Sequence, residues 1–186
     1  MISYVKANSV NDWLKNEIDN ILNTYKNESI TKVERYSIVE DSINRNFAGV
    51  GIAKFVAGKA WSAADKETKE NYIILFKRHL ALNIASLMEG YSGQTFTIED
   101  KKNVADDVIL IDMEIQDKTN KILITWRIKE SKNRFYIIDL LVADISLVVT
   151  KRSEFNTMLK KFDYDLRIFN ENLSNQNNIS YNKLIK

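Results

Sequence analysis

Asp112 and Glu114 are the residues of this chain whose type and spacing best suit acid–base chemistry. They lie two positions apart in a stretch of alternating apolar residues, so both carboxylates point to one side of a predicted strand. Such a pair can pass protons or hold a cation. A solvated sheet face explains the same pattern more simply, and we favour that interpretation. An enzyme that uses the pair as acid and base is the alternative.

The other reactive residue types form no catalytic set. His79 is the single histidine, and no Ser–His–Asp or Cys–His arrangement surrounds it, so we expect a structural or surface role. The chain has no cysteine, which excludes disulfides, zinc–thiolate sites and thiol nucleophiles. Gly49-Val50-Gly51 lacks the third glycine and the preceding strand of a dinucleotide-binding motif. We therefore predict no catalytic residue, no metal site and no cofactor.

Asp139 is a carboxylate inside an otherwise apolar stretch, where it needs a partner. The helix that is predicted to begin after Ser146 can bring the guanidinium of Arg152 to it in a bidentate ion pair. We predict that this pair ties the sheet to the helix and that Ser146 is the N-cap. All three residues are then structural.

Composition restricts the class of protein further. The chain has 186 residues, of which 27 are basic and 25 acidic, and the two signs are interspersed. No basic patch is present, so nucleic acid is not expected as a partner. No apolar run approaches the roughly 20 residues that span a bilayer, and Met1-Ile2-Ser3-Tyr4 lacks a signal-peptide pattern. We expect either a cytoplasmic protein or a mature form whose export signal was removed.

Helical periodicity occupies the first half of the chain. Ser9 precedes a predicted helix over residues 10–25, and Ser29 precedes a second one that ends near Asn46. Residues 47–58 predict a short buried helix, and residues 63–90 the longest helix. Phe76 and Leu80 belong to the apolar stripe of this long helix.

A period of two begins after Gly93 and predicts four strands, over residues 95–98, 108–115, 121–128 and 134–142. Their short links indicate an antiparallel meander. In the last strand, Phe135, Ile137 and Leu141 are expected to share one face. We predict an α+β fold in which a twisted four-stranded antiparallel sheet is wrapped by six to seven helices.

These elements predict one domain over residues 1–173. It divides into N-terminal helices (1–46), a helical part with the long helix (47–93), the antiparallel sheet (94–142) and C-terminal helices (146–173). The Asn-rich residues 174–186 are predicted to be a flexible tail.

The apolar stripes on the sheet and the long helix allow two interpretations. Either they fill a solid core, or they stand apart and enclose a pocket for an apolar ligand. An eight-residue strand spans about 26 Å, comparable to an extended acyl chain. Periodicity does not choose between a filled core and a cavity.

Several motifs follow one another in a fixed order over residues 39–173. They are Phe47, Gly58-Lys59-Ala60-Trp61-Ser62-Ala63-Ala64, Phe76 with Leu80 and Tyr91, Ile138-Asp139-Leu140 with Ile145-Ser146-Leu147, and Arg152-Ser153-Glu154-Phe155. This ordered set resembles the MlaC family, also called the toluene-tolerance family, of periplasmic phospholipid-binding proteins. The chain departs from the family at Asp144, where glycine is usual, at Ala143, where an acidic residue is common, and at Phe135, where tryptophan is frequent.

The resemblance implies a nuclear-transport-factor-like cone with a lipid cavity and a carrier that catalyses no reaction. Members of the family move glycerophospholipids between an outer-membrane lipoprotein–porin complex and an inner-membrane ABC transporter complex with a substrate-binding ring. This transport maintains outer-membrane lipid asymmetry in Gram-negative bacteria. The resemblance further implies that the cargo is a phospholipid, that the protein is periplasmic and that its precursor carries a signal peptide.

Alternation along the strands and the helix stripe then predicts the lining of the cavity. The predicted lipid-binding residues are Phe76, Leu80, Ile109, Ile111, Met113, Ile122, Ile124 and Trp126. Two other functions stay open: a small-molecule enzyme in a cone-shaped α+β fold that uses Asp112 and Glu114, and an interaction module without a cavity.

Overall fold

The computed structural model describes residues 9–91, 93–99, 102–105, 107–116 and 120–186. The helices are α1 (Val10–Lys26), α2 (Lys32–Asn46), α3 (Gly49–Ala57), α4 (Lys59–Ala63), α5 (Lys66–Met88), α6 (Leu147–Lys160) and α7 (Leu166–Ile185). The strands are β1 (Thr95–Ile98), β2 (Lys102–Ala105), β3 (Val108–Gln116), β4 (Lys121–Ser131), β5 (Arg134–Val142) and β6 (Ile145–Ser146). The predicted α+β class is confirmed. None of the helices in these ranges is long and apolar enough to cross a bilayer.

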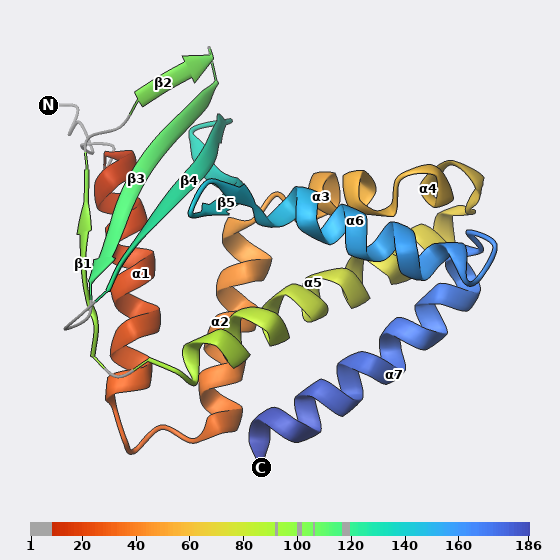
Figure 1. Cartoon of the computed structure of the whole chain (residues 1–186), viewed down its shortest axis with the longest axis horizontal. Coiled ribbons are helices and arrows are strands. Elements are labelled where there is room, and N and C mark those ends of the chain that lie inside the picture. Colours follow the sequence, from red (N-terminus) through yellow and green to blue (C-terminus); the bar gives the residue numbers. More distant parts are fainter. Residues whose placement is uncertain (1–8, 92, 100–101, 106, 117–119) are drawn as a thin grey trace, which may run out of the picture.

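The strands form one antiparallel sheet in the order β1-β3-β4-β5-β6, and β2 also pairs with β3. Sheet and α1 lie at one end of the molecule, whereas α3 to α7 extend toward the other (Figure 1). The four predicted strands are present as β1, β3, β4 and β5. The sheet of the described residues nevertheless has six strands rather than four. The sequence Lys102-Asn103-Val104-Ala105 of β2 does not alternate between polar and apolar residues, and β6 has only two residues.

A β-bulge in β5 changes which side chains share a face of the sheet. Ile128 pairs with Ile137, but the neighbouring Arg127 pairs with Asp139, so Ile138 is the extra residue. The expectation that Leu141 lies on the same face as Ile137 is therefore wrong. Beyond the bulge, Leu140 and Val142 lie on that face instead, since they pair with Trp126 and Ile124.

Side-chain caps fix where the helices begin. Ser9 caps α1 as predicted, since its Oγ accepts a hydrogen bond from the Asp12 N–H at 3.1 Å. Thr31, not Ser29, caps α2, because Thr31 and Glu34 form a reciprocal capping box. The long helix α5 begins at Lys66 with Asp65 as its cap, three residues later than predicted, and Ala63 is the last residue of the separate α4.

The prediction of a flexible tail over residues 174–186 is wrong, because α7 continues to Ile185 and packs along α5. Leu173, Asn177 and Leu184 are buried. Asn177 donates from Nδ2 to the Leu75 carbonyl at 2.9 Å, and Asn170, one heptad earlier, donates to the Thr68 carbonyl at 3.0 Å. These amides hold α7 in register on α5.

The α7 packing predicts that Leu184→Ala destabilises the protein by about 2–3 kcal/mol, the usual effect of truncating a buried leucine. Ile179→Ala, on the same helix at a side chain that is 69% exposed, should change stability by less than about 0.5 kcal/mol. Urea unfolding of both variants measures this. Equal, small effects would mean that the last turns of α7 do not pack as described.

Candidate functional site

An apolar strip runs across β4, β5 and β6 on the side of the sheet that faces the helices. Trp126 pairs with Leu140, Ile124 pairs with Val142, and Val142 pairs with Ile145, so these side chains share one face. We call this surface the inner strip; its members are Ile122, Ile124, Trp126, Leu140, Val142 and Ile145. Ile122 is 45% exposed and Ile145 64%, and the other members are partly buried. The inner strip is therefore accessible apolar surface.

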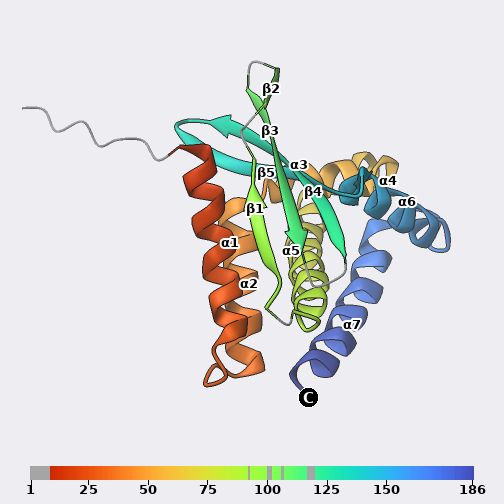
Figure 2. The same ribbon diagram turned by 60° about the vertical axis from the view of Figure 1, so that its left-hand side comes forward.

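The β3 half of the same face is covered. Ile109, Ile111 and Met113 are buried beneath the α1 side chains, which include Leu14 and Ile18. Helices α2 and α5 lie behind the strands when the sheet comes forward (Figure 2). Ile128 of β4 and Ile137 of β5, which lie in one row with Ile109, are buried in the same cluster. The cover thus includes β3 and this row, and the inner strip is left less covered.

Phe47 marks the junction between the sheet and the helices. The buried side chains of the described residues form three clusters, one beneath the sheet and two among the helices. Phe47 is only partly buried and packs against all three. Its position is fixed because the next residue, Ala48, donates its N–H to the Ile137 carbonyl at 2.9 Å. The inner strip and this junction form the candidate site for an apolar ligand.

The structure brings together only part of the predicted lining. Ile122, Ile124 and Trp126 belong to the inner strip, and Leu80 is partly buried where the two helical clusters meet. Phe76 lies instead in an aromatic cluster, with its ring centroid 5.8 Å from Tyr72 and 5.7 Å from Phe155.

Four residues of the site escaped the sequence analysis: Phe47, Leu140, Val142 and Ile145. Leu140 and Val142 face the site only because of the bulge. Strand β6 has two residues, too few to show the alternation that would have predicted the position of Ile145. Phe47, Leu140 and Ile145 belong to the motifs of the family resemblance, which is the one sequence signal that points to them.

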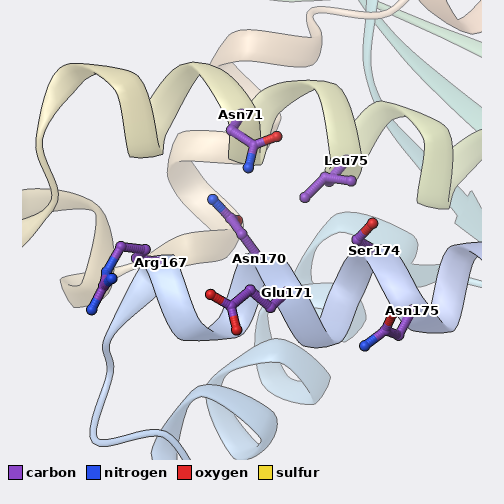
Figure 3. A pocket seen from close by; sticks show the side chains of 7 residues that line it. All are labelled: Asn71, Leu75, Arg167, Asn170, Glu171, Ser174 and Asn175. Carbon is purple, nitrogen blue, oxygen red and sulfur yellow. The ribbon is translucent and has the colours of Figure 1, made fainter.

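Two surface hollows lie elsewhere, and charged side chains contribute to the lining of both. One of about 400 Å³ lies between α5 and α7 (Figure 3). It is lined by Asn71, Leu75, Arg167, Asn170, Glu171, Ser174 and Asn175. A second hollow of about 320 Å³ lies beside the turn between α6 and α7. Amide and charged side chains suit a polar group rather than an acyl chain, so neither hollow replaces the inner strip as the apolar site.

Asp112 and Glu114 lie on the opposite, outer face and are engaged in cross-strand pairs. Asp112 accepts a hydrogen bond from the Thr125 hydroxyl at 2.6 Å, and its pKa is lowered mainly by that bond. The Lys102 Nζ atom lies 3.1 Å from Asp112 Oδ2, and the Lys121 Nζ atom lies 2.8 Å from Glu114 Oε1. Within the ranges that the structure describes, no three histidine or acidic side chains are grouped as metal ligands would be. This geometry favours an ion-paired sheet face over an acid–base pair.

Asp139 ties the sheet to α6, but not through Arg152. Its buried carboxylate accepts hydrogen bonds from the Ser146 hydroxyl at 2.6 Å and from the Val148 N–H at 3.1 Å. Its ion-pair partner is Arg127, with Nη1 3.7 Å from Oδ2, because the bulge places the two residues opposite each other. The predicted Asp139–Arg152 pair is therefore corrected.

Arg152 instead connects α6 to α3. It donates from Nη1 to the Phe55 carbonyl at 2.8 Å and lies over the Phe55 ring at 4.4 Å. Ser146 caps α6 as predicted, since its Oγ accepts from the Val149 N–H at 3.0 Å.

The MlaC family model, described as "MlaC protein", matches residues 15–168. The chain belongs to the MlaC family. A solved structure of a phospholipid-binding protein from Ralstonia solanacearum, in complex with a phospholipid, matches it with a TM-score of 0.75. The two sequences are 17% identical, and the match covers 90% of this chain and 96% of that one. The two proteins therefore share a fold.

The contacts of Asp139 predict different couplings in double-mutant cycles. Asp139→Ala and Ser146→Ala should couple by about 1–2 kcal/mol, because the hydroxyl donates directly to the carboxylate. Asp139→Ala and Arg152→Ala should be additive within about 0.5 kcal/mol. Chemical unfolding of the single and double variants measures both couplings. Coupling to Arg152 as large as that to Ser146 would contradict the assignment.

His79 predicts a pH dependence of stability. Burial, with a smaller contribution from Lys151, lowers its pKa from 6.5 to about 4, and its ring lies 5.3 Å from Phe155. Between pH 4 and 6.5 the unfolded chain therefore binds more protons at His79 than the folded chain does. The stability that comes from keeping this imidazole neutral is lost as pH falls through that window.

We expect the stability difference between wild type and His79→Gln to shrink by up to about 3 kcal/mol from pH 7 to pH 4. Urea unfolding at both pH values measures it, and the subtraction removes the common titration of carboxylates. A difference that is the same at both pH values would show that the imidazole is not held neutral.

Proposed function

We propose that this protein binds a phospholipid, with the acyl chains against the inner strip and the headgroup in water. The observation that carries the proposal is the inner strip itself, because its members are apolar and contiguous and two of them, Ile122 and Ile145, are exposed. Monomeric proteins rarely leave contiguous apolar surface uncovered unless it binds something. The phospholipid held by the Ralstonia protein of the same fold supports this choice of ligand.

Transfer of the acyl chains from water supplies the driving force. Each buried methylene contributes about 0.8 kcal/mol, so long chains bind strongly without specific headgroup contacts. The strip has no charged member, which suits the tails and excludes the headgroup from it. Ile109, Ile111 and Met113 extend the same face beneath α1, and movement of α1 would add them to the lining.

Membership of the MlaC family supports a carrier rather than an enzyme. We propose that the protein carries glycerophospholipids through the periplasm, between an outer-membrane lipoprotein–porin complex and an inner-membrane ABC transporter complex with a substrate-binding ring. This traffic would maintain outer-membrane lipid asymmetry. It requires no catalytic residue and no cofactor besides the lipid cargo.

Ile124→Asp should reduce the phospholipid that co-purifies with the protein to less than about a tenth, because a carboxylate on the inner strip must be desolvated by the tails. Organic extraction followed by mass spectrometry measures lipid per protein. Leu123→Asp is the matched control, since Leu123 is adjacent, 41% exposed and on the outer face. It should keep its lipid.

Two outcomes would contradict the proposal: a wild-type protein without phospholipid, or a folded Ile124→Asp variant with undiminished lipid. Equal losses in the two variants would show that the inner strip is not the binding face. Circular dichroism establishes that both variants are folded before their lipid content is compared.

A further inference from the structure

We infer that the indole N–H of Trp126 donates a hydrogen bond to an ester carbonyl oxygen of the bound phospholipid and so sets the depth of the lipid in the site. This inference rests on the proposed function, and it assigns one named contact within it.

Trp126 occupies the centre of the sheet. Its Cα partners are Ile111 on β3 and Leu140 on β5, so it lies at the border between the covered half of the inner face and the inner strip. The neighbouring strip residues on its own strand are Ile122 and Ile124, which carry no acceptor. The indole is thus a polar group within an apolar surface.

The Trp126 Nε1 atom is shielded from solvent and has no hydrogen-bond partner among the residues that the structure describes. Buried N–H groups are normally paired, and an unpaired one is destabilising. The other shielded polar atoms without a partner in these ranges belong to Asn11, Arg35, Tyr72, His79, Asn170 and Asn177, none of which is a member of the inner strip. Trp126 is therefore the member of the inner strip that carries a shielded hydrogen-bond donor without a partner.

The chemistry of the donor selects the acceptor. An indole N–H only donates, so its partner must be an acceptor. A diacyl phospholipid offers ester carbonyls at the border between its tails and its headgroup, and phosphate oxygens beyond them. A charged phosphate beside Ile124 and Leu140 would lose its hydration at a large cost, whereas a neutral carbonyl costs less to bury and the indole hydrogen bond offsets that cost. The ester carbonyl is therefore the acceptor that fits an apolar strip.

The test compares ester- and ether-linked lipids on delipidated protein. The probes are diacyl and dialkyl phosphatidylglycerol of equal chain length, because the ether linkage lacks the carbonyl. Wild type should bind the diacyl lipid about tenfold more tightly, the effect expected for one hydrogen bond in a buried site. Trp126→Phe keeps the aromatic ring and should bind both lipids equally.

Trp61→Phe is the matched control. Trp61 packs in the cluster of α3 to α7, away from the inner strip, so its replacement should leave the preference for the diacyl lipid intact. A preference that persists in Trp126→Phe, or that is absent in wild type, would overturn the inference. If Trp126→Phe weakened the binding of both lipids equally, the hydrogen bond would go to another part of the lipid, and the inference of an ester contact would be wrong. Wild type that binds neither lipid would instead refute the proposed function.

A spectroscopic measurement on the wild-type protein tests the same bond without relying on a variant's stability. The Trp126 indole ¹H–¹⁵N signal should move downfield when the diacyl lipid binds and should move less with the dialkyl lipid. An indole signal that is equally displaced by both lipids, or by neither, would contradict the ester contact.

Discussion

Helix α1 covers only part of the inner face of the sheet, and this incomplete cover is the constraint on which the site depends. Val10, Leu14 and Ile18 of α1 share a buried cluster with β3 and with Ile128 and Ile137 beside it, but the members of the inner strip are only partly buried or are exposed. Apolar surface left in water costs about 25 cal/mol per Å². A ligand that covers the inner strip is therefore favoured by the same force that packs α1 against β3.

The geometry of the strip is maintained by one buried carboxylate and one extra residue. The bulge at Ile138 turns Leu140 and Val142 toward the interior and Asp139 toward the other face, beside Arg127. Asp139 then accepts hydrogen bonds from Ser146 and Val148, which fixes the start of α6 against β5. The same few residues thus complete the strip and attach the helical half of the molecule to the sheet.

The parts of this structure that the sequence predicts are those with strong local signals. Alternation identified β1, β3, β4 and β5, the Ser9 and Ser146 caps were correctly placed, and the family resemblance agrees with the family match. The turn before Ser146 also keeps its left-handed backbone without glycine, with φ of 47° at Ala143 and 64° at Asp144.

A β-bulge does not show in the alternation of a strand's sequence, so both the partner of Asp139 and the members of the strip on β5 were missed. The second half of α7, after Leu173, was missed because its buried residues are Asn177 and Leu184, seven positions apart, and because the Asn177 amide bonds to α5.

An isotope-filtered NOE experiment tests the central claim most directly, with ¹³C-methyl-labelled protein and unlabelled diacyl phospholipid. We predict NOEs from acyl-chain protons to the methyl groups of Ile122, Ile124 and Val142, and none to Leu159, which is fully buried in a helical cluster. Acyl-chain NOEs confined to α5 and α7, with none to the inner strip, would show that the inner strip is not where the lipid binds.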